Sequence, residues 1–250
     1  MAPPFRFKGS CVIDTVIIPP SGIASKAHGA QAKPDRDAFA LCVLEVAARR
    51  AGVAAIDALA LRVLVARGGA VKRAYLVREL VLGGPACSRL LNRLEAVDFA
   101  VRLCGSDRRT LEIELLDDGW DAAERVSVEF SDCARDVART WGELLARGAS
   151  DDGRPIVFGG AAVDGAAVCG ADVFRDDVTL DDALAANQAL AQLCEGQQLT
   201  RTQALCLMVV RASGMNAFAP RAATTIAQLA SFSRTTVRSA LWTLRKRGLL

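Results

Sequence analysis

The chain has 250 residues, of which 52% are hydrophobic and 24% charged, with a formal net charge of +3 at pH 7. This length allows one large domain or two ordinary ones, and the hydrophobic content excludes a disordered chain. No uninterrupted apolar stretch reaches the roughly 18 residues of a membrane span, so we expect no membrane partner and predict a cytoplasmic, nucleoid-associated protein.

Eight cysteines and one histidine, His28, are spread along the chain without a CxxC pair. This spacing is typical neither of a zinc site nor of a small disulfide-rich domain. No Ser/His/Asp set or phosphate-binding glycine loop is visible, and a single histidine leaves little for acid–base chemistry. We therefore expect no metal, no other cofactor and no enzymatic activity, with small thiols buried or half-buried in a reducing compartment.

The first part of the chain predicts an arm followed by a helical region. Residues 1–34 contain five prolines, which indicates an arm that packs on the body or on a partner. Helical spacing of apolar residues then predicts helices over 36–52, 55–67 and 70–82, followed by a fourth that begins near Pro85. In the first of these helices, Phe39, Val43, Val46 and Ala47 are expected on one face.

Beyond residue 98 the apolar period changes from about 3.6 to 2. The segments FAVRLC (99–104) and TLEIELL (110–116) alternate in this way, with GSDRR between them, which predicts a β-hairpin. Phe99, Val101 and Leu103 would lie on one face of the first strand. Asp117 or Asp118 would then cap a long helix over about 119–147.

The last hundred residues predict a linker and a second domain. Residues 149–180 are rich in glycine and aspartate, which indicates a linker with a short strand near 156–158. Helical patterns return over about 181–195, 200–212, 222–231 and 234–247. From Gln197 to the end there is no acid, against eight basic residues, which is the charge pattern of a segment that meets phosphate or of a solvated basic face.

The helix predicted over 234–247 has two distinct faces. Val237, Ala240, Leu241 and Leu244 have the spacing that seats a helix on a core. The opposite face and the capping residue supply the candidate DNA contacts, which are Ser233, Arg234, Thr235, Thr236, Arg238, Ser239, Arg245 and Lys246. Guanidinium groups, hydroxyls and free backbone N–H groups suit phosphates and base edges in a major groove.

Trp242 also lies opposite the core stripe. It would pack on the linker or the first domain, or contact DNA sugar or a partner subunit, and we favour packing.

The segment IAQLASFSRTTVRSALWTLRKRGLL (226–250) resembles the helix-turn-helix of bacterial winged-helix regulators, especially the GntR family. The resemblance is carried by an apolar–Ala pair, the Ser-Arg-x-Thr-Val-Arg run from Ser233, and the closing Gly-Leu pair. Ser231 stands where that family prefers glycine. The resemblance implies a recognition helix over the basic segment.

The segment SDRRTLEIELLDDG (106–119) resembles the wing of the MarR family, although Leu116 stands where threonine is usual. By that resemblance Arg108 and Arg109 would lie at the wing, with Asp107 orienting an arginine toward the minor groove. The resemblance spans about 35–148 and implies a homodimer through the helices near 36–52 and 119–147.

The preceding helix would be the first recognition helix, with Leu90, Leu91, Leu94 and Val97 on its core face. Its candidate DNA contacts are Ser88, Arg89 and Asn92. Glu95 also points outward, where it would repel a phosphate. The first unit therefore either contacts DNA or is a degenerate unit kept for dimerisation or packing.

The sequence thus predicts a mainly α protein with tandem winged helix-turn-helix units and a small β-hairpin wing in the first, in domains at 35–148 and 181–250. Residues 56–68 align without gaps on 202–214, which indicates a weak internal repeat. The predicted function is sequence-specific binding of double-stranded DNA by a bacterial transcriptional regulator. The alternatives are a plasmid-type replication initiator or a winged-helix module that binds another protein.

Overall fold

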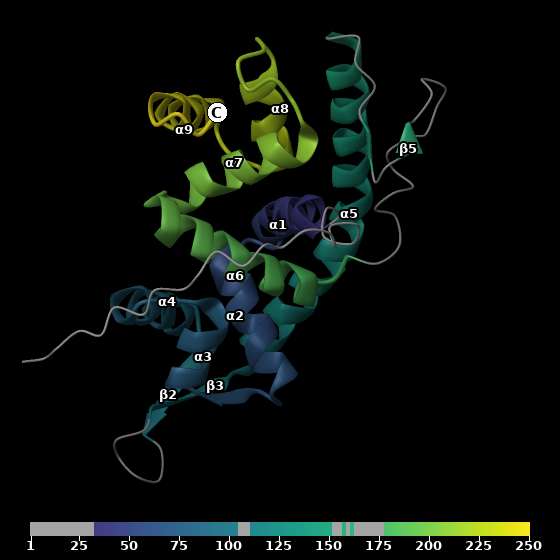
Figure 1. Cartoon of the computed structure of the whole chain (residues 1–250). Helices are drawn as coiled ribbons and strands as arrows, with labels where there is room; N and C mark the ends of the chain where they lie inside the picture. The colour runs from purple at the N-terminus through teal and green to yellow at the C-terminus, as the bar shows by residue number, and fades with distance from the viewer. Residues whose placement is uncertain (1–32, 105–110, 152–156, 159–160, 163–177) are drawn as a thin grey trace, which may run out of the picture. The chain divides into compact units, whose positions relative to one another are not determined.

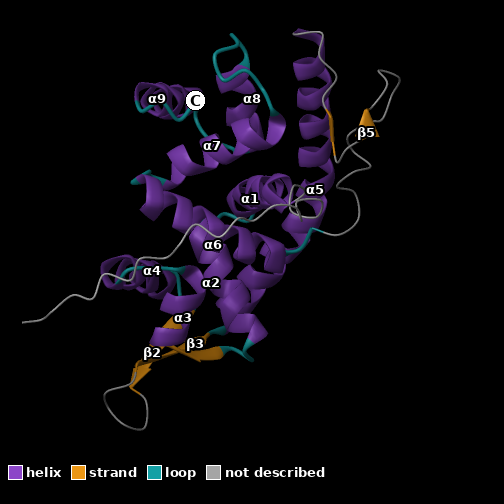
Figure 2. Ribbon diagram, viewed as in Figure 1, coloured by secondary structure: helices purple, strands orange, loops and turns teal. Residues whose placement is uncertain are grey.

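The computed structural model describes residues 33–104, 111–151, 157–158, 161–162 and 178–250. Within these ranges the chain is mainly helical with one small three-stranded antiparallel sheet, so the predicted mainly α class is confirmed (Figures 1 and 2). The arm predicted at 1–34 lies almost wholly outside the described residues. The strand predicted near 156–158 is present as β4 (Val157–Phe158), which pairs with β5 (Ala161–Ala162).

The first part of the described chain alternates helices with short strands. In order, its elements are α1 (Lys33–Arg50), α2 (Ala55–Ala66), β1 (Ala70–Lys72), α3 (Arg73–Leu80), α4 (Gly84–Ala96), β2 (Ala100–Cys104), β3 (Leu111–Leu115) and α5 (Asp117–Asp151). The helix predicted over 70–82 is wrong at its start, because residues 70–72 form β1 and pair with β3 through Val71 and Ile113. A three-residue strand is too short to show a period of two.

The sheet order is β1-β3-β2, and its register corrects the predicted face of β2. Ala100 is opposite Leu115 and Arg102 is opposite Ile113, so these residues share one face, on which Ala100, Ile113 and Leu115 are buried and Arg102 is half-buried. Directly opposite residues point to the same side of an antiparallel pair. Leu103, expected on an apolar face, is 41% exposed instead.

The long helix α5 begins earlier than predicted. Asp117 and Asp118 lie inside its first turn, where their carboxylates face the positive end of the helix dipole. The turn into this helix is tight. The Leu116 N–H donates a hydrogen bond to the Phe99 carbonyl, and the Trp120 N–H donates to the Leu116 carbonyl, each at 3.0 Å. The hairpin and the helix are therefore joined without a flexible connection.

Helix α1 is buried on all sides, which differs from the single apolar face that was predicted. Residues 38–44, 47 and 48 are at most 1% exposed. The helix packs against α5, against α6 (Leu180–Gln197) and against α7 (Arg201–Ser213), and the Phe39 ring meets the Trp141 ring edge-on at 5.9 Å. A helix that is apolar all round belongs in a core. As a result, one continuous core runs from Ala38 to Leu244.

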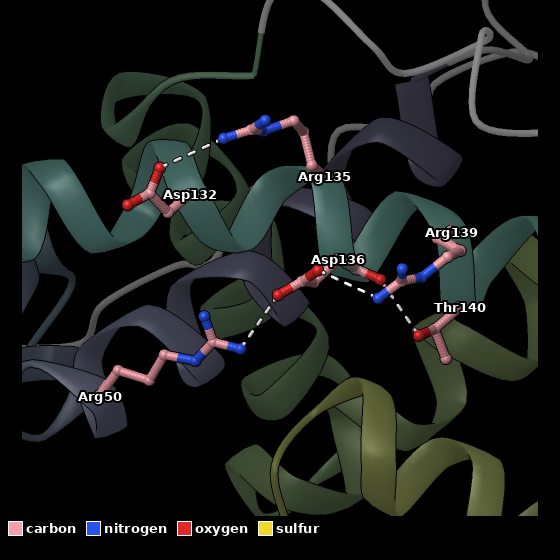
Figure 3. A network of polar contacts seen from close by, with 6 residues as sticks. All are labelled: Arg50, Asp132, Arg135, Asp136, Arg139 and Thr140. Carbon is pink, nitrogen blue, oxygen red and sulfur yellow. Dashed lines mark hydrogen bonds and ion pairs between the residues drawn. The ribbon is translucent and has the colours of Figure 1, made fainter.

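Charged side chains fasten the end of α1 to α5 (Figure 3). The Asp136 carboxylate accepts from Arg50 at 3.1 Å and from Arg139 at 3.2 Å, while the Thr140 hydroxyl donates to the Asp136 carbonyl at 3.1 Å. Both arginines are about half exposed or more, so each pair contributes at most about 1 kcal/mol. The network orients the two helices more than it stabilises them.

A partly buried network of polar side chains connects the two halves of the sequence. Arg201 at the start of α7 pairs with Glu45 of α1 at 3.4 Å and donates to the Asn187 side-chain oxygen at 2.5 Å. Asn187 in turn donates to the Leu80 carbonyl at the end of α3, at 3.2 Å. Burial raises the pKa of the Glu45 carboxyl, and Arg201 offsets part of that shift.

The last part of the chain is helical, with α6 and α7 followed by α8 (Ala222–Leu229) and α9 (Arg234–Lys246). Helices α6 and α7 each begin with a capping box, formed by Thr179 with Asp182 and by Thr200 with Gln203. Helix α9 packs on α7 and α8. This part therefore forms a bundle whose last helix is basic.

The turn between α3 and α4 has the same local geometry as the turn between α8 and α9. Val81 and Ser231 adopt left-handed φ angles of 52° and 54°, and each is followed by a backbone bond of 3.0 Å that closes the turn, Leu82 to Val77 and Phe232 to Ala227. Ser231 thus has the conformation for which glycine is usual. The shared turn extends the repeat that the sequence alone indicated.

Candidate nucleic-acid interface

Helix α9 is capped and seated as the sequence predicted. The Ser233 hydroxyl accepts from the Thr236 backbone N–H at 3.0 Å, and the two hydroxyl oxygens lie 2.6 Å apart. The core stripe is buried, with Val237 and Leu244 at 0% exposure and Ala240 and Leu241 at 4% and 6%. The remaining faces of the helix are left for solvent or for a partner.

The predicted contact residues of α9 share one property, which is exposure to solvent. Exposed side chains run along the helix and its cap: Ser233, Arg234, Thr235, Thr236, Arg238, Ser239, Arg245 and Lys246. Among the described residues, none of these three arginines or Lys246 forms an ion pair. The chain has no acid after Glu195, so no carboxylate side chain of α7, α8 or α9 offsets the positive charge of this surface.

Arg247 differs from its basic neighbours. Its guanidinium donates to the carbonyls of Gln197 and Gln198, the first of them at 2.5 Å and the second at 3.0 Å. These carbonyls lie at the C-terminal end of α6, where a cation also meets the negative end of the helix dipole. Arg247 therefore fastens α9 to α6, and the free charge lies on the residues before it.

Trp242 is 57% exposed, so the predicted packing of this side chain on the first domain is wrong for the described residues, and most of the linker lies outside them. It lines a cavity of about 210 Å³ together with residues 217–220, Ala223, Arg238, Leu241 and Arg245. We call this the aromatic cleft. Phe218, which precedes α8, forms its other aromatic wall and is 49% exposed.

Cations cover part of the aromatic surface. The Arg245 guanidinium carbon lies 4.7 Å from the Phe218 ring centre, and the Lys246 nitrogen lies 4.9 Å from the Trp242 ring centre. Both distances are within the range of cation–π attraction. Sequence reasoning did not identify Phe218, although an isolated phenylalanine in the loop-forming segment NAFAP is a signal that could have found it.

On α4, the predicted contacts are only partly free. The Ser88 hydroxyl donates to the Gly84 carbonyl at 3.1 Å and accepts from Arg73 at 3.3 Å. The Asn92 oxygen accepts from Arg102 at 2.9 Å, whereas Arg89 is exposed. Two of the three candidates are therefore engaged within the protein.

The core face of α4 differs from the prediction at one position. Val97 is 51% exposed because the helix ends at Ala96, and Cys87 takes a place in the core instead. Leu90, Leu91 and Leu94 are buried as predicted. Pro85 lies at the start of the helix, also as predicted.

Glu95 does not present a free carboxylate as the sequence suggested. Its Oε1 atom accepts from the Arg102 side chain at 2.7 Å and from the Arg102 backbone at 3.1 Å, and its Oε2 atom pairs with the same guanidinium. These hydrogen bonds lower the pKa of the Glu95 carboxyl. The register of β2 makes the pair, because it turns Arg102 toward α4 rather than toward solvent.

One arginine of α4 is also neutralised. Arg93 makes a two-point contact with the Asp57 carboxylate of α2, at 3.1 and 2.5 Å, and the Asp57 side chain is only 11% exposed. The basic residues of α4 and β2 are thus largely paired with acids. Helix α9 carries the same residue types without such partners.

The wing residues predicted by resemblance, Asp107, Arg108 and Arg109, lie outside the described residues. The two strands on either side of them, β2 and β3, are paired from Ala100 with Leu115 to Cys104 with Leu111. The hairpin itself is therefore confirmed.

The two helices predicted to pair subunits differ in what they expose. Helix α1 is covered by helices of its own chain, whereas α5 exposes Trp120 (41%) and Val128 (56%). Of the two, α5 retains the surface that a second copy could contact.

A larger cavity of about 590 Å³ lies between α2, α5 and the start of α6. Arg62 and Asp181 form a two-point ion pair at its edge, at 2.7 and 3.0 Å, while Trp120 and Phe130 contribute aromatic surface. Its volume is in the range of sites for small organic ligands.

Comparison of the chain with protein-family models, curated proteins and solved structures finds no match. In the described part of the chain, no group of three or more His, Cys, Asp or Glu side chains is arranged to hold a metal ion. No described helix is long and apolar enough to cross a membrane. The surfaces of the protein, above all that of α9, therefore carry the information on its function.

Proposed function

We propose that this protein binds double-stranded DNA in a sequence-specific manner and acts as a transcriptional regulator, with α9 as its recognition helix. The observation that carries the proposal is the uncompensated basic face of α9. Arg234, Arg238, Arg245 and Lys246 are exposed without acidic partners in the described chain, while the opposite face is fixed on the core. Such a helix enters a major groove with phosphate contacts along its flanks and polar contacts to base edges.

The start of α9 adds a second favourable feature. Ser233 satisfies one of the backbone N–H groups of the first turn, and the positive end of the helix dipole is exposed with it. Helix N-termini of this kind bind phosphate oxygens. Arg234 and Thr235 flank that end, so a DNA backbone could be held there while Arg238 and Ser239 face the bases.

The order of elements supports a winged helix-turn-helix in the first unit. Helix α2, strand β1, helices α3 and α4, and strands β2 and β3 follow one another in the order that this plan requires, with β3 in the middle of the sheet. The turn shared by α3–α4 and α8–α9 supports a second, related unit. We therefore propose tandem units of unequal function.

In this proposal the second unit reads DNA and the first unit has a supporting role. The polar and charged side chains of α4 are held by Arg73, Arg102 and Asp57, and of its predicted contacts Arg89 alone is exposed without a hydrogen bond among the described residues. Breaking the internal pairs to make DNA contacts would offset much of the gain. Arg89 is left to add a phosphate contact.

The experiment measures DNA affinity as a function of salt. Bound fragments are first selected from genomic DNA with the full chain, and one of them is then titrated by fluorescence anisotropy with the parent, Arg234→Ala and Arg238→Ala. We expect each variant to bind about tenfold more weakly. Loss of a phosphate contact should also reduce the slope of log K against log salt by about one.

Arg135→Ala is the matched control, because Arg135 is 78% exposed on α5 and lies outside α9. It should leave both affinity and salt slope unchanged. If Arg234→Ala and Arg238→Ala bind random and selected duplexes as well as the parent does, α9 is not the recognition helix. Selected sites made of direct repeats at an origin would favour a replication initiator, and a stable protein partner without duplex binding would favour an interaction module.

A further inference from the structure

The aromatic cleft beside α9 is not explained by duplex binding. Phe218 and Trp242 expose about half of their surface on neighbouring elements and face the same cavity. Large aromatic side chains that are exposed together are uncommon on a protein surface unless they meet a ligand or a partner. Bases in an intact duplex are stacked and present only their edges, of which the thymine methyl is the apolar part.

The chemistry of the cleft specifies a planar and negatively charged ligand. Its walls include the aromatic rings of Phe218 and Trp242, and its rim carries Arg238 and Arg245. Lys246 lies over the Trp242 ring. No acid occurs in the chain after Glu195 to repel an anion. A nucleotide combines both properties, because its base stacks on an aromatic face and its phosphate binds guanidinium groups.

The volume and position of the aromatic cleft further limit which ligand it can bind. At about 210 Å³ it is smaller than the sites of about 300 to 1,000 Å³ that hold drug-sized ligands, so it suits a single ring system. Arg238 belongs both to the cleft and to the exposed face of α9. A base that is unpaired beside the bound duplex would therefore lie within reach of the rings.

We infer that the aromatic cleft binds an unpaired nucleobase, so that the second unit recognises DNA in which a duplex adjoins a locally opened segment. The inference rests on the proposed binding of α9 to duplex DNA. Phe218 and Trp242 stack on the unpaired base. Arg245 binds a phosphate beside it, and Arg238 lies between the cleft and the duplex.

The test compares two DNA ligands that differ only in pairing. A labelled duplex and the same duplex with a short mismatched bubble are titrated with the full chain by fluorescence anisotropy. We expect the parent to bind the bubble about tenfold more tightly than the duplex. Phe218→Ala and Trp242→Ala should each bring this ratio close to one while changing duplex affinity by less than about twofold.

Two further variants separate stacking from a general loss of structure. Trp242→Phe keeps an aromatic face and should retain most of the preference for the bubble. Val128→Ala, at an apolar position of α5 that is 56% exposed, should leave the ratio unchanged. Thermal unfolding followed by circular dichroism shows that each variant is folded.

Equal affinity of the parent for bubble and duplex overturns the inference, as does a preference that persists in both alanine variants. Duplex binding without a preference for the bubble refutes only the cleft. Binding of opened DNA through Phe218 and Trp242 without duplex binding supports the cleft and refutes the proposed function. Absence of binding to either ligand refutes both.

Discussion

Gly119 in the first turn of α5 is the position where one added methyl group should be most damaging. A Cβ atom there would lie 2.0 Å from the Phe99 carbonyl oxygen, 2.9 Å from the Phe99 carbonyl carbon and 2.7 Å from the Leu115 Cδ1 atom. Ordinary contact begins at 3.4 Å, so the Phe99 carbonyl would have to move by more than 1 Å. That carbonyl accepts the Leu116 N–H at 3.0 Å, and the bond joins the hairpin to the helix.

The expected change in the free energy of unfolding has two destabilising contributions and one stabilising contribution. Overpacking costs about 1 to 3 kcal/mol, and loss of the Leu116 hydrogen bond costs about 1 kcal/mol more. The preference of helices for alanine over glycine offsets up to about 1 kcal/mol. Gly119→Ala should therefore lower the free energy of unfolding by about 1 to 3 kcal/mol, as measured by urea denaturation followed by circular dichroism.

Gly196→Ala is the control, because it makes the same chemical change in a helix with no atom within 4 Å of the new Cβ. Near the end of α6 it should raise the free energy of unfolding by about 0.5 to 1 kcal/mol. Opposite signs for the two variants support the close approach at Gly119. A Gly119→Ala protein within about 0.5 kcal/mol of the parent would refute the reasoning.

Two further predictions concern titration and thiol reactivity. Burial raises the pKa of Glu45 above its ordinary value of 4.5, so the stability that Glu45 contributes is lost as the pH rises from 4.5 through the folded pKa. Hydrogen bonds lower the pKa of Glu95, so the stability that Glu95 contributes is lost as the pH falls below 4.5. The free energy of unfolding, measured by urea denaturation from acid to neutral pH, should depend less on pH above 4.5 in Glu45→Gln and less on pH below 4.5 in Glu95→Gln. The opposite result for the two variants would contradict the environments of both carboxyl groups. Burial raises the pKa of the Cys206 thiol to about 12, so N-ethylmaleimide at pH 8 should modify the exposed Cys104 before Cys206. Equal rates of modification of these two cysteines, measured by mass spectrometry, would contradict the burial of Cys206.

Much of the local structure could be predicted because it depends on neighbours along the chain. The core stripe from Val237 to Leu244, the Ser233 cap and the hairpin around Ile113 each occupy a few residues with a clear period or signature. The start of α3 and the single-sided burial of α1 were predicted wrongly. Residues 70–72 are a strand only because β3 lies beside them, and α1 is buried all round only because α5, α6 and α7 cover it.

In the candidate site, too, the sequence predicted the features of single elements but not the contacts between elements. Sequence alone showed that the end of the chain has no acids and that its last helix has a basic face opposite a core stripe. It could not show that Phe218 and Trp242 share one cleft, since they lie 24 positions apart and meet through the packing of α8 and α9. It also predicted a free charge at Glu95 of α4, although Arg102 of β2 neutralises that carboxylate.

By itself, therefore, the sequence determined where most helices and the β-hairpin form, which side of α9 is buried, and the sign of the charge at the end of the chain. Only the tertiary structure decided which charges are free. Arg93 of α4 and Arg102 of β2 meet Asp57 and Glu95, whereas the arginines of α9 meet no acid in the described chain. The physical reason is that periodicity records the burial of a single element, while the pairing of charges and the joining of aromatic walls depend on contacts between elements that are distant in sequence.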